Sequence, residues 1–167
     1  MTTQTKTAND MPAARTFTGE LEITIAAPRE TVWRALVEQL DAWWSRDYCA
    51  TAGPQKMTLE ARAGGHLIEE GADGAAVMWF TVLAIEPGSS LDLIGHISPA
   101  YGGPATSMLR LALTSGATEA ETVLRVTDAL FGRLSDKIPT CAMDGWQVIF
   151  GEGLKAFVEG GTAARAG

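Results

Sequence analysis

Glu69 is the first residue whose type and position could serve chemistry. It shares its strand parity with Leu67, while Glu70 takes the opposite face. A strand with adjacent glutamates must aim one of them at the inner side of a sheet, because successive side chains alternate. Burial would raise the pKa of that carboxyl and suit it to proton transfer. The alternative is a carboxylate in water at the rim.

A second carboxylate, Asp128, follows the same logic on a later strand. It shares a parity with Leu124 and Val126, opposite to Arg125. If those apolar residues face the core, Asp128 faces it too, and an unpaired buried charge is costly enough to need a reason. The alternative is a turn residue at the end of the strand.

His96 and Tyr101 complete the set of candidate acid–base residues. The parity of His96 matches Asp92 and Ile94, which predicts that it faces outward or lies at a rim. Tyr101 lies in a glycine-rich stretch, where it is either a lid residue or an exposed loop residue. These four residues are the catalytic candidates if the protein is an enzyme.

No complete catalytic or metal-binding motif is visible. The sequence lacks a local Ser/His/Asp or Cys/His set and a glycine-rich phosphate loop between a strand and a helix. The two cysteines, Cys49 and Cys141, form no disulfide framework and have no metal-ligand spacing to either histidine. We therefore expect neither a metal nor a cofactor.

Short apolar and alternating runs predict the elements that must position these residues. A strand is expected at 16–25, a helix at 29–40 and a glycine-rich loop at 98–106. Further strands are expected at residues 57–62, 66–70, 77–85, 91–97, 108–113 and 122–130. The order predicts an α+β fold in which a curved antiparallel sheet wraps around a long C-terminal helix.

That last helix, expected at 139–159, has the strongest amphipathic pattern of the chain. Trp146, Phe150 and Leu154 fall on its apolar stripe, and Gly153 falls among them. A glycine inside a helix costs about 1 kcal/mol relative to alanine. It predicts either close packing of the helix on the sheet or a notch for a guest molecule, and we favour the notch.

Length and composition indicate one globular domain. The chain has 167 residues, of which 46% are hydrophobic and 20% charged, and its net charge is −7. Without a basic cluster, binding to nucleic acid or to an anionic membrane surface is not expected. We expect a disordered leader at 1–15, a single domain at 16–159 and a flexible tail at 160–167. A cytoplasmic location is expected, and a homodimer is left open.

Three stretches resemble the START-like superfamily, also called SRPBCC or polyketide cyclase/START-related. Residues 27–36 (APRETVWRAL) followed by Trp43-Trp44 are similar to the opening of the branch that is named after an activator of a heat-shock chaperone ATPase. Residues 62–66 (RAGGH) resemble its glycine turn, and Gly145-Trp146 with Leu154 resembles its final helix. The resemblance implies a helix-grip fold with a cavity between sheet and helix. It implies no catalytic residue, because the superfamily shares none.

Such a cavity predicts a binding site for a small apolar or aromatic molecule. Its predicted walls are Trp44, Leu67, Met78, Phe80, Leu93, Leu109, Leu111, Leu124, Val126, Met143, Trp146, Phe150 and Gly153. The same residues could instead form a packed core. We favour a binding protein over a cofactor-free acid–base enzyme of the cyclase, dehydratase or isomerase kind. A chaperone-associated interaction protein is the third hypothesis, by analogy.

Overall fold

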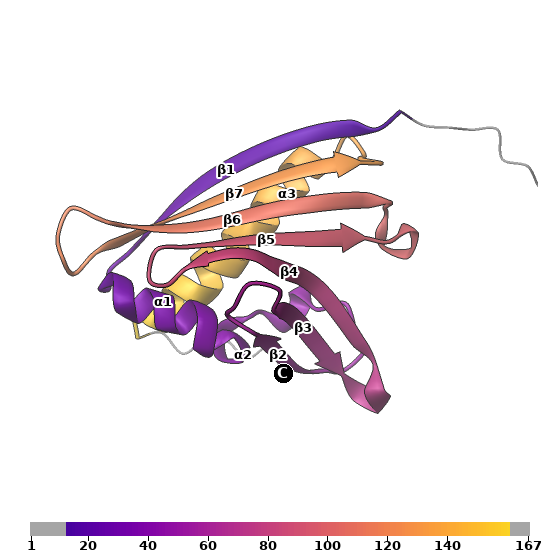
Figure 1. Ribbon diagram of the computed structural model, residues 1–167. Coiled ribbons are helices and arrows are strands. Elements are labelled where there is room, and N and C mark those ends of the chain that lie inside the picture. Colours follow the sequence, from indigo (N-terminus) through magenta and orange to yellow (C-terminus); the bar gives the residue numbers. More distant parts are fainter. Residues whose placement is uncertain (1–12, 161–167) are drawn as a thin grey trace, which may run out of the picture.

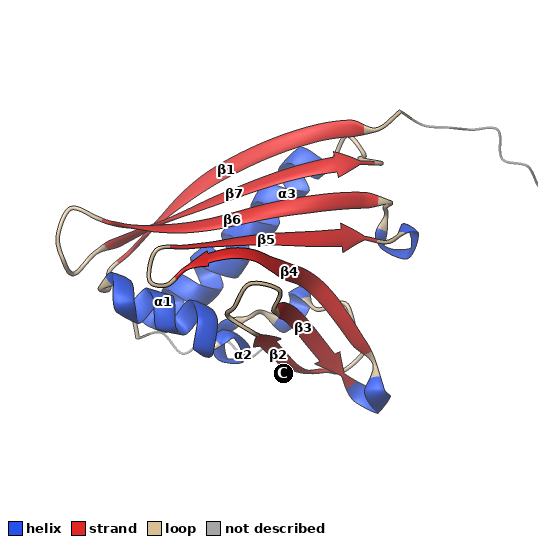
Figure 2. Cartoon of the chain, in the orientation of Figure 1, coloured by secondary structure: helices blue, strands red, loops and turns tan. Residues whose placement is uncertain are grey.

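A computed structural model describes residues 13–160 (Figures 1 and 2). Its elements follow the predicted order of a strand, short helices, six strands and a long helix. They are β1 (Arg15–Ile25), α1 (Arg29–Glu38), α2 (Leu40–Trp43), η1 (Arg46–Tyr48), β2 (Pro54–Leu59), β3 (His66–Gly71), η2 (Ala72–Gly74), β4 (Ala76–Glu86), β5 (Ser90–Ile97), η3 (Pro99–Tyr101), β6 (Ala105–Ser115), β7 (Thr122–Gly132), α3 (Ile138–Trp146), η4 (Gln147–Leu154) and α4 (Lys155–Val158).

The strands form one antiparallel sheet in the order β1-β7-β6-β5-β4-β3-β2. Strands that follow one another from β2 to β7 are neighbours, and β1 pairs with β7 at the far edge. The sheet curves around α3 and its continuation, as Figure 1 shows. The predicted α+β helix-grip fold is confirmed.

The C-terminal helix is continuous but not uniform. Between α3 and α4 the segment η4 is π-helical, and at its end the N–H of Lys155 donates to the carbonyl of Phe150, five residues earlier. Ile149, Phe150 and Leu154 are buried in this wider segment. The apolar stripe was therefore predicted correctly, whereas the π-helical turn, which is rare and often found at functional sites, was not.

A β-bulge in β4 changes the orientation expected for one predicted wall residue, Met78, which borders the cavity from an exposed position. Leu67 pairs with Phe80, but Ile68 pairs with Met78, so Trp79 is an extra residue in β4. Strict alternation placed Met78 inside with Phe80. The bulge instead leaves the side chain of Met78 52% exposed and brings Trp79 to the inner side beside Phe80.

The starts of two strands differ most from the prediction. β2 begins at Pro54 rather than at residue 57, and β6 begins at Ala105, inside the stretch expected to be a loop. Ala105 pairs with Ile97 on one side and Gly132 on the other. Pairing to two neighbouring strands therefore extends β6 into a region whose glycines and prolines suggest a loop.

The chain ends are described only in part. β1 begins at Arg15, one residue before the predicted strand, and Arg15 pairs with Asp136 at 2.6 Å. The rest of the predicted leader (1–12) and of the predicted tail (161–167) lies outside the described residues.

Candidate functional site

Most of the predicted cavity beneath the helix is filled by side chains. The buried members of the predicted wall are Trp44, Leu67, Phe80, Leu93, Leu109, Leu111, Leu124, Val126 and Phe150. The residual space among the described residues of this core is about 10 Å³, which is barely enough for one water molecule. These residues therefore form a packed core in this part of the molecule.

Gly153 provides close packing of the helix, so the hypothesis of a notch for a guest molecule is wrong. A Cβ atom at this position would lie 2.8 Å from the backbone carbonyl oxygen of Trp43. The glycine lets the helix approach the end of α2, and no sequence pattern predicts that α2 lies there. The indole N–H of Trp43 donates to the carbonyl of Ala35 at 2.9 Å, which anchors this contact.

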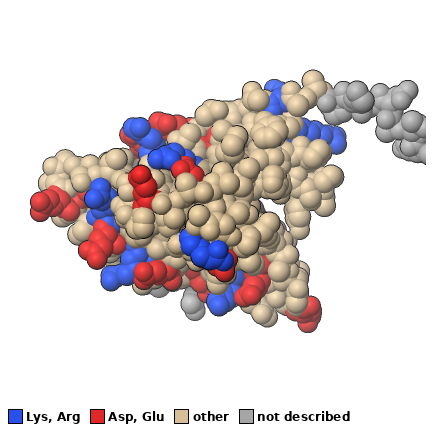
Figure 3. Space-filling view, in the orientation of Figure 1, with Lys and Arg blue, Asp and Glu red and all other residues tan. Residues whose placement is uncertain are grey.

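An open cavity of about 310 Å³ lies further along the helix, toward its N-terminal end. It is bordered by the inner side of β4, the end of β5, the turn η3 and the loop that follows η1. Its lining residues are Ala50, Val77, Met78, Trp79, Phe80, Gly95, His96, Ile97, Tyr101 and Trp146. In Figure 3 the surface is hollowed on the right, where uncharged residues predominate. The volume lies at the lower end of the range for small-molecule sites.

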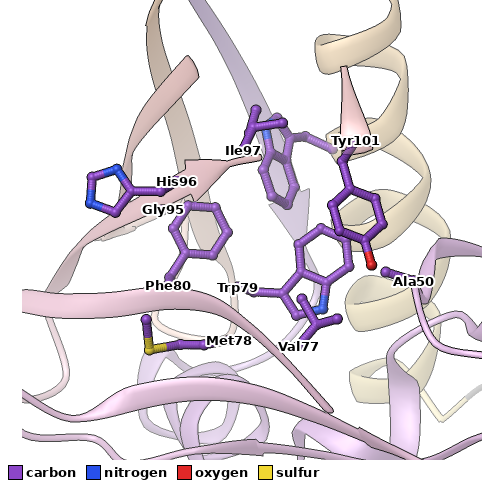
Figure 4. A pocket seen from close by; sticks show the side chains of 10 residues that line it. Ala50, Val77, Met78, Trp79, Phe80, Gly95, His96, Ile97 and Tyr101 are labelled. Atoms are coloured by element: carbon purple, nitrogen blue, oxygen red, sulfur yellow. The ribbon is translucent and has the colours of Figure 1, made fainter. Parts of the chain in front are cut away.

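Aromatic rings dominate this cavity. Figure 4 shows the rings of Trp79, Phe80 and Tyr101 directed at one common space. The rings of Phe80 and Trp146 lie 6.3 Å apart between their centroids, and Trp146 in turn stacks on Phe150 at 5.6 Å. The cavity walls are therefore continuous with the aromatic core and are held in place by it.

Glu69 supports one wall of the cavity from behind. It is fully buried, and its carboxylate accepts hydrogen bonds from the indole N–H of Trp79 at 2.8 Å and from the backbone N–H groups of Ala50 and Thr51 at 2.9 and 2.6 Å. The hydroxyl of Thr51 donates a further hydrogen bond. The carboxylate thus joins β3 to β4 and to the loop that carries Ala50.

The pKa of Glu69 moves in the opposite direction from the sequence prediction. Burial alone raises the pKa of this carboxyl, but the hydrogen bonds from Thr51, Ala50 and Trp79 outweigh burial and bring the pKa below its ordinary value. The expected rise in pKa is wrong because every donor stabilises the ionised form. Glu69 stays ionised at neutral pH and holds structure together.

Asp128 lies in the interior of β7, facing the helix, and is not a turn residue. It is 2% exposed and accepts hydrogen bonds from the Ser107 hydroxyl at 2.6 Å and from the Trp146 indole N–H at 2.8 Å. Burial raises the pKa of Asp128, and these hydrogen bonds only partly offset that effect. The carboxyl does not line the cavity, because the indole of Trp146 lies between the carboxyl and the cavity.

The other candidate residues lie at the rim or elsewhere. The imidazole of His96 is exposed, lies 3.1 Å from the hydroxyl of Thr106 and points away from the cavity (Figure 4). Tyr101 is 60% exposed and lines the cavity from η3, which makes it both a loop residue and part of the opening. Met143 occupies the space left by Gly19 on β1 and is not among the residues that line the cavity.

Sequence reasoning missed half of the cavity lining. Ala50, Val77, Trp79, Gly95 and Ile97 were not proposed as site residues. Trp79 has opposite parity to Phe80, so alternation placed it outside, and the bulge that reverses this has no signature in the sequence. The others lie at ends of strands and in a loop, where only the assembled fold brings them together.

A curved sheet that grips a C-terminal helix and leaves a cavity at one end defines a START-like (SRPBCC) domain. A family model described as Activator of Hsp90 ATPase homolog 1-like protein matches residues 26–159. The chain belongs to this family. No curated protein matches the sequence significantly.

Solved structures show the same fold at low sequence identity. Protein MLL2253 from Mesorhizobium loti is 22% identical with a TM-score of 0.63, over 86% of this chain and 97% of that one. The structure of Ara h 8.0201 is 15% identical with a TM-score of 0.62, over 86% and 98%. CalU16 from Micromonospora echinospora is 18% identical with a TM-score of 0.59, over 89% and 86%. These matches support the fold alone.

Two features are absent from residues 13–160. No helix in this range is both long and apolar enough to cross a membrane. No three His, Cys, Asp or Glu side chains of the range come together in a way that could hold a metal ion.

Proposed function

We propose that this protein binds a small apolar or aromatic molecule in the cavity between β4, η3 and Trp146. The observation that carries the proposal is the contrast in space under one helix. About 310 Å³ remains at the aromatic end, whereas about 10 Å³ remains in the core beside it. A cavity of about 150 Å³ in another protein holds benzene, so this larger, open one suits about two rings inside and a third at its opening.

The lining supports binding more than it supports acid–base catalysis. Among the described residues that border the cavity, none carries a carboxyl group, and the imidazole of His96 points away. Glu69 and Asp128 both lie behind an indole, and their oxygens accept hydrogen bonds from it and from neighbouring groups. The Tyr101 hydroxyl is the remaining candidate for an enzyme of this fold.

The test uses N-phenyl-1-naphthylamine, a neutral aromatic dye that fluoresces in apolar sites. We expect saturable binding to the full chain, and loss of binding in the Ala50→Trp variant, whose indole would occupy the cavity. The matched control is Leu83→Trp, which adds the same side chain at an exposed position of β4. Undiminished dye binding by Ala50→Trp would contradict the proposed site.

An interaction with a chaperone has the family description as its support. It is tested separately, by adding the purified protein to a Hsp90 chaperone and measuring the rate of ATP hydrolysis. Stimulation that survives Ala50→Trp would point to a surface of the molecule other than the cavity.

A further inference from the structure

The cavity has an uneven electrostatic lining. Four aromatic rings border it, those of Trp79, Phe80, Tyr101 and Trp146. Within the described part of the chain, no Lys or Arg side chain lines it. The face of an aromatic ring is its negative side, so a guest that lies on these rings meets negative potential.

Buried carboxylates strengthen this potential. The indole N–H of Trp79 donates to Glu69 and that of Trp146 donates to Asp128, each at 2.8 Å. A hydrogen bond to an ionised acceptor polarises its donor, and in a poorly hydrated interior such effects add along a chain of bonds. Both indoles that border the cavity are therefore backed by a carboxyl group on the edge away from the guest.

The charge of these carboxyl groups is not cancelled by ion pairs. Every hydrogen-bond donor to Glu69 and Asp128 in residues 13–160 is uncharged, and neither residue takes part in a salt bridge there. Glu69, whose pKa lies below its ordinary value, carries its charge at neutral pH. Its field reaches the cavity across a single indole ring.

We infer that the cavity prefers a small cationic guest with an apolar body, such as an alkylated ammonium or an aromatic amine, and rejects anions. A cation over aromatic rings is attracted by their negative faces, most strongly where water is excluded. An anion would lose its water without meeting a positive side chain. This inference rests on the proposed ligand-binding function and adds the charge of the ligand.

A set of three probes of one shape isolates the effect of charge. Phenyltrimethylammonium is cationic, tert-butylbenzene is its neutral counterpart, and benzenesulfonate carries a negative group of similar size. We expect phenyltrimethylammonium to bind the full chain about tenfold more tightly than tert-butylbenzene, and benzenesulfonate to bind more weakly than both. Tryptophan fluorescence reports binding, because Trp79 and Trp146 border the cavity.

The outcomes separate this inference from the proposed function. If tert-butylbenzene or benzenesulfonate binds as tightly as the cation, the inference is overturned while ligand binding stands. If none of the three probes binds but N-phenyl-1-naphthylamine does, the inference alone is overturned. If that dye fails as well, the proposed function is overturned with it.

The Tyr101→Leu variant tests the part played by a ring. Tyr101 is exposed at the opening, so its replacement should leave the fold intact. We expect binding of phenyltrimethylammonium to weaken by about threefold to tenfold and that of tert-butylbenzene to change by less than about twofold. The matched control is Phe131→Leu, an exposed ring outside the cavity lining, which should change neither. Equal weakening of both probes by Tyr101→Leu would overturn the inference.

Discussion

The C-terminal helix covers two stretches of the same sheet and leaves very different amounts of space above them. Around Phe150 and Leu154 the space is closed by α2, because Trp43 packs on Phe150 with 6.0 Å between ring centroids. Around Trp146 the cavity lining includes no residue of α1 or α2, and the turn η3 and the loop after η1 border an opening instead. The elements around the rim thus divide this helix-grip fold into a closed part, around Phe150 and Leu154, and an open part, around Trp146.

The two buried carboxyl groups also differ from each other, although both accept a hydrogen bond from an indole. Glu69 and Asp128 each accept an indole N–H at 2.8 Å, yet their pKa values shift in opposite directions. Glu69 has four donors, two of them backbone N–H groups, and Asp128 has two side-chain donors. The number of donors, weighed against burial, decides whether the charged form is favoured.

The largest expected effect is in the closed part. Phe150→Ala removes a ring that is 2% exposed and contacts both Trp43 and Trp146, so we expect a loss of about 3–5 kcal/mol in the free energy of unfolding. Chemical denaturation measures it. The control Phe131→Ala, on an exposed ring, should change that free energy by less than about 0.5 kcal/mol. Equal losses in both variants would contradict the packed core.

Gly153→Leu probes the contact that closes this part. Since a Cβ atom would already lie 2.8 Å from the Trp43 carbonyl oxygen, we expect overpacking that costs about 1–3 kcal/mol. The control is Gly145→Ala, whose Cβ would meet Tyr48 at 3.4 Å, an ordinary contact, and whose helix propensity rises by about 1 kcal/mol. A thermal melt in which Gly153→Leu is as stable as the parent would restore the notch hypothesis.

The carboxylate pair predicts opposite dependences of stability on pH. The lowered pKa of Glu69 gives stability that is present above its ordinary value of 4.5 and is lost as pH falls through the folded-state pKa. The raised pKa of Asp128 gives a penalty at neutral pH that is relieved as pH falls from the folded-state pKa to its ordinary value of 3.8.

Paired denaturation curves across acidic pH test this difference. The parent should have a higher free energy of unfolding than Glu69→Gln at neutral pH, and this difference should disappear below pH 4.5. Relative to Asp128→Asn, the parent should gain stability as pH falls toward 3.8. Trends of the same sign in the two comparisons would show that the two sites do not differ as described.

The smallest expected effect on stability is at the open part. Tyr101→Ala removes a ring that is 60% exposed, so we expect the free energy of unfolding to change by less than about 0.5 kcal/mol. Binding of N-phenyl-1-naphthylamine should nevertheless weaken, because the ring lines the cavity. A large loss of stability with unchanged dye binding would assign Tyr101 to the core.

Local sequence patterns were enough to predict the order of the elements and most of the inward faces. Alternation on β7 placed Leu124, Val126 and Asp128 toward the helix, and the helical pattern placed Trp146 and Phe150 toward the sheet. These features follow from local periodicity, which one segment of chain carries alone.

The position of the cavity, in contrast, depends on how distant segments of the chain pack together. The bulge at Trp79 depends on how β4 pairs with β3, and the partner of Gly153 depends on where α2 ends against the helix. Three of the four donors that lower the pKa of Glu69 come from Ala50 and Thr51, which are 19 and 18 residues away along the chain. Register, close approach and hydrogen bonding between distant segments are set by all the elements packing together, so no local pattern could reveal them.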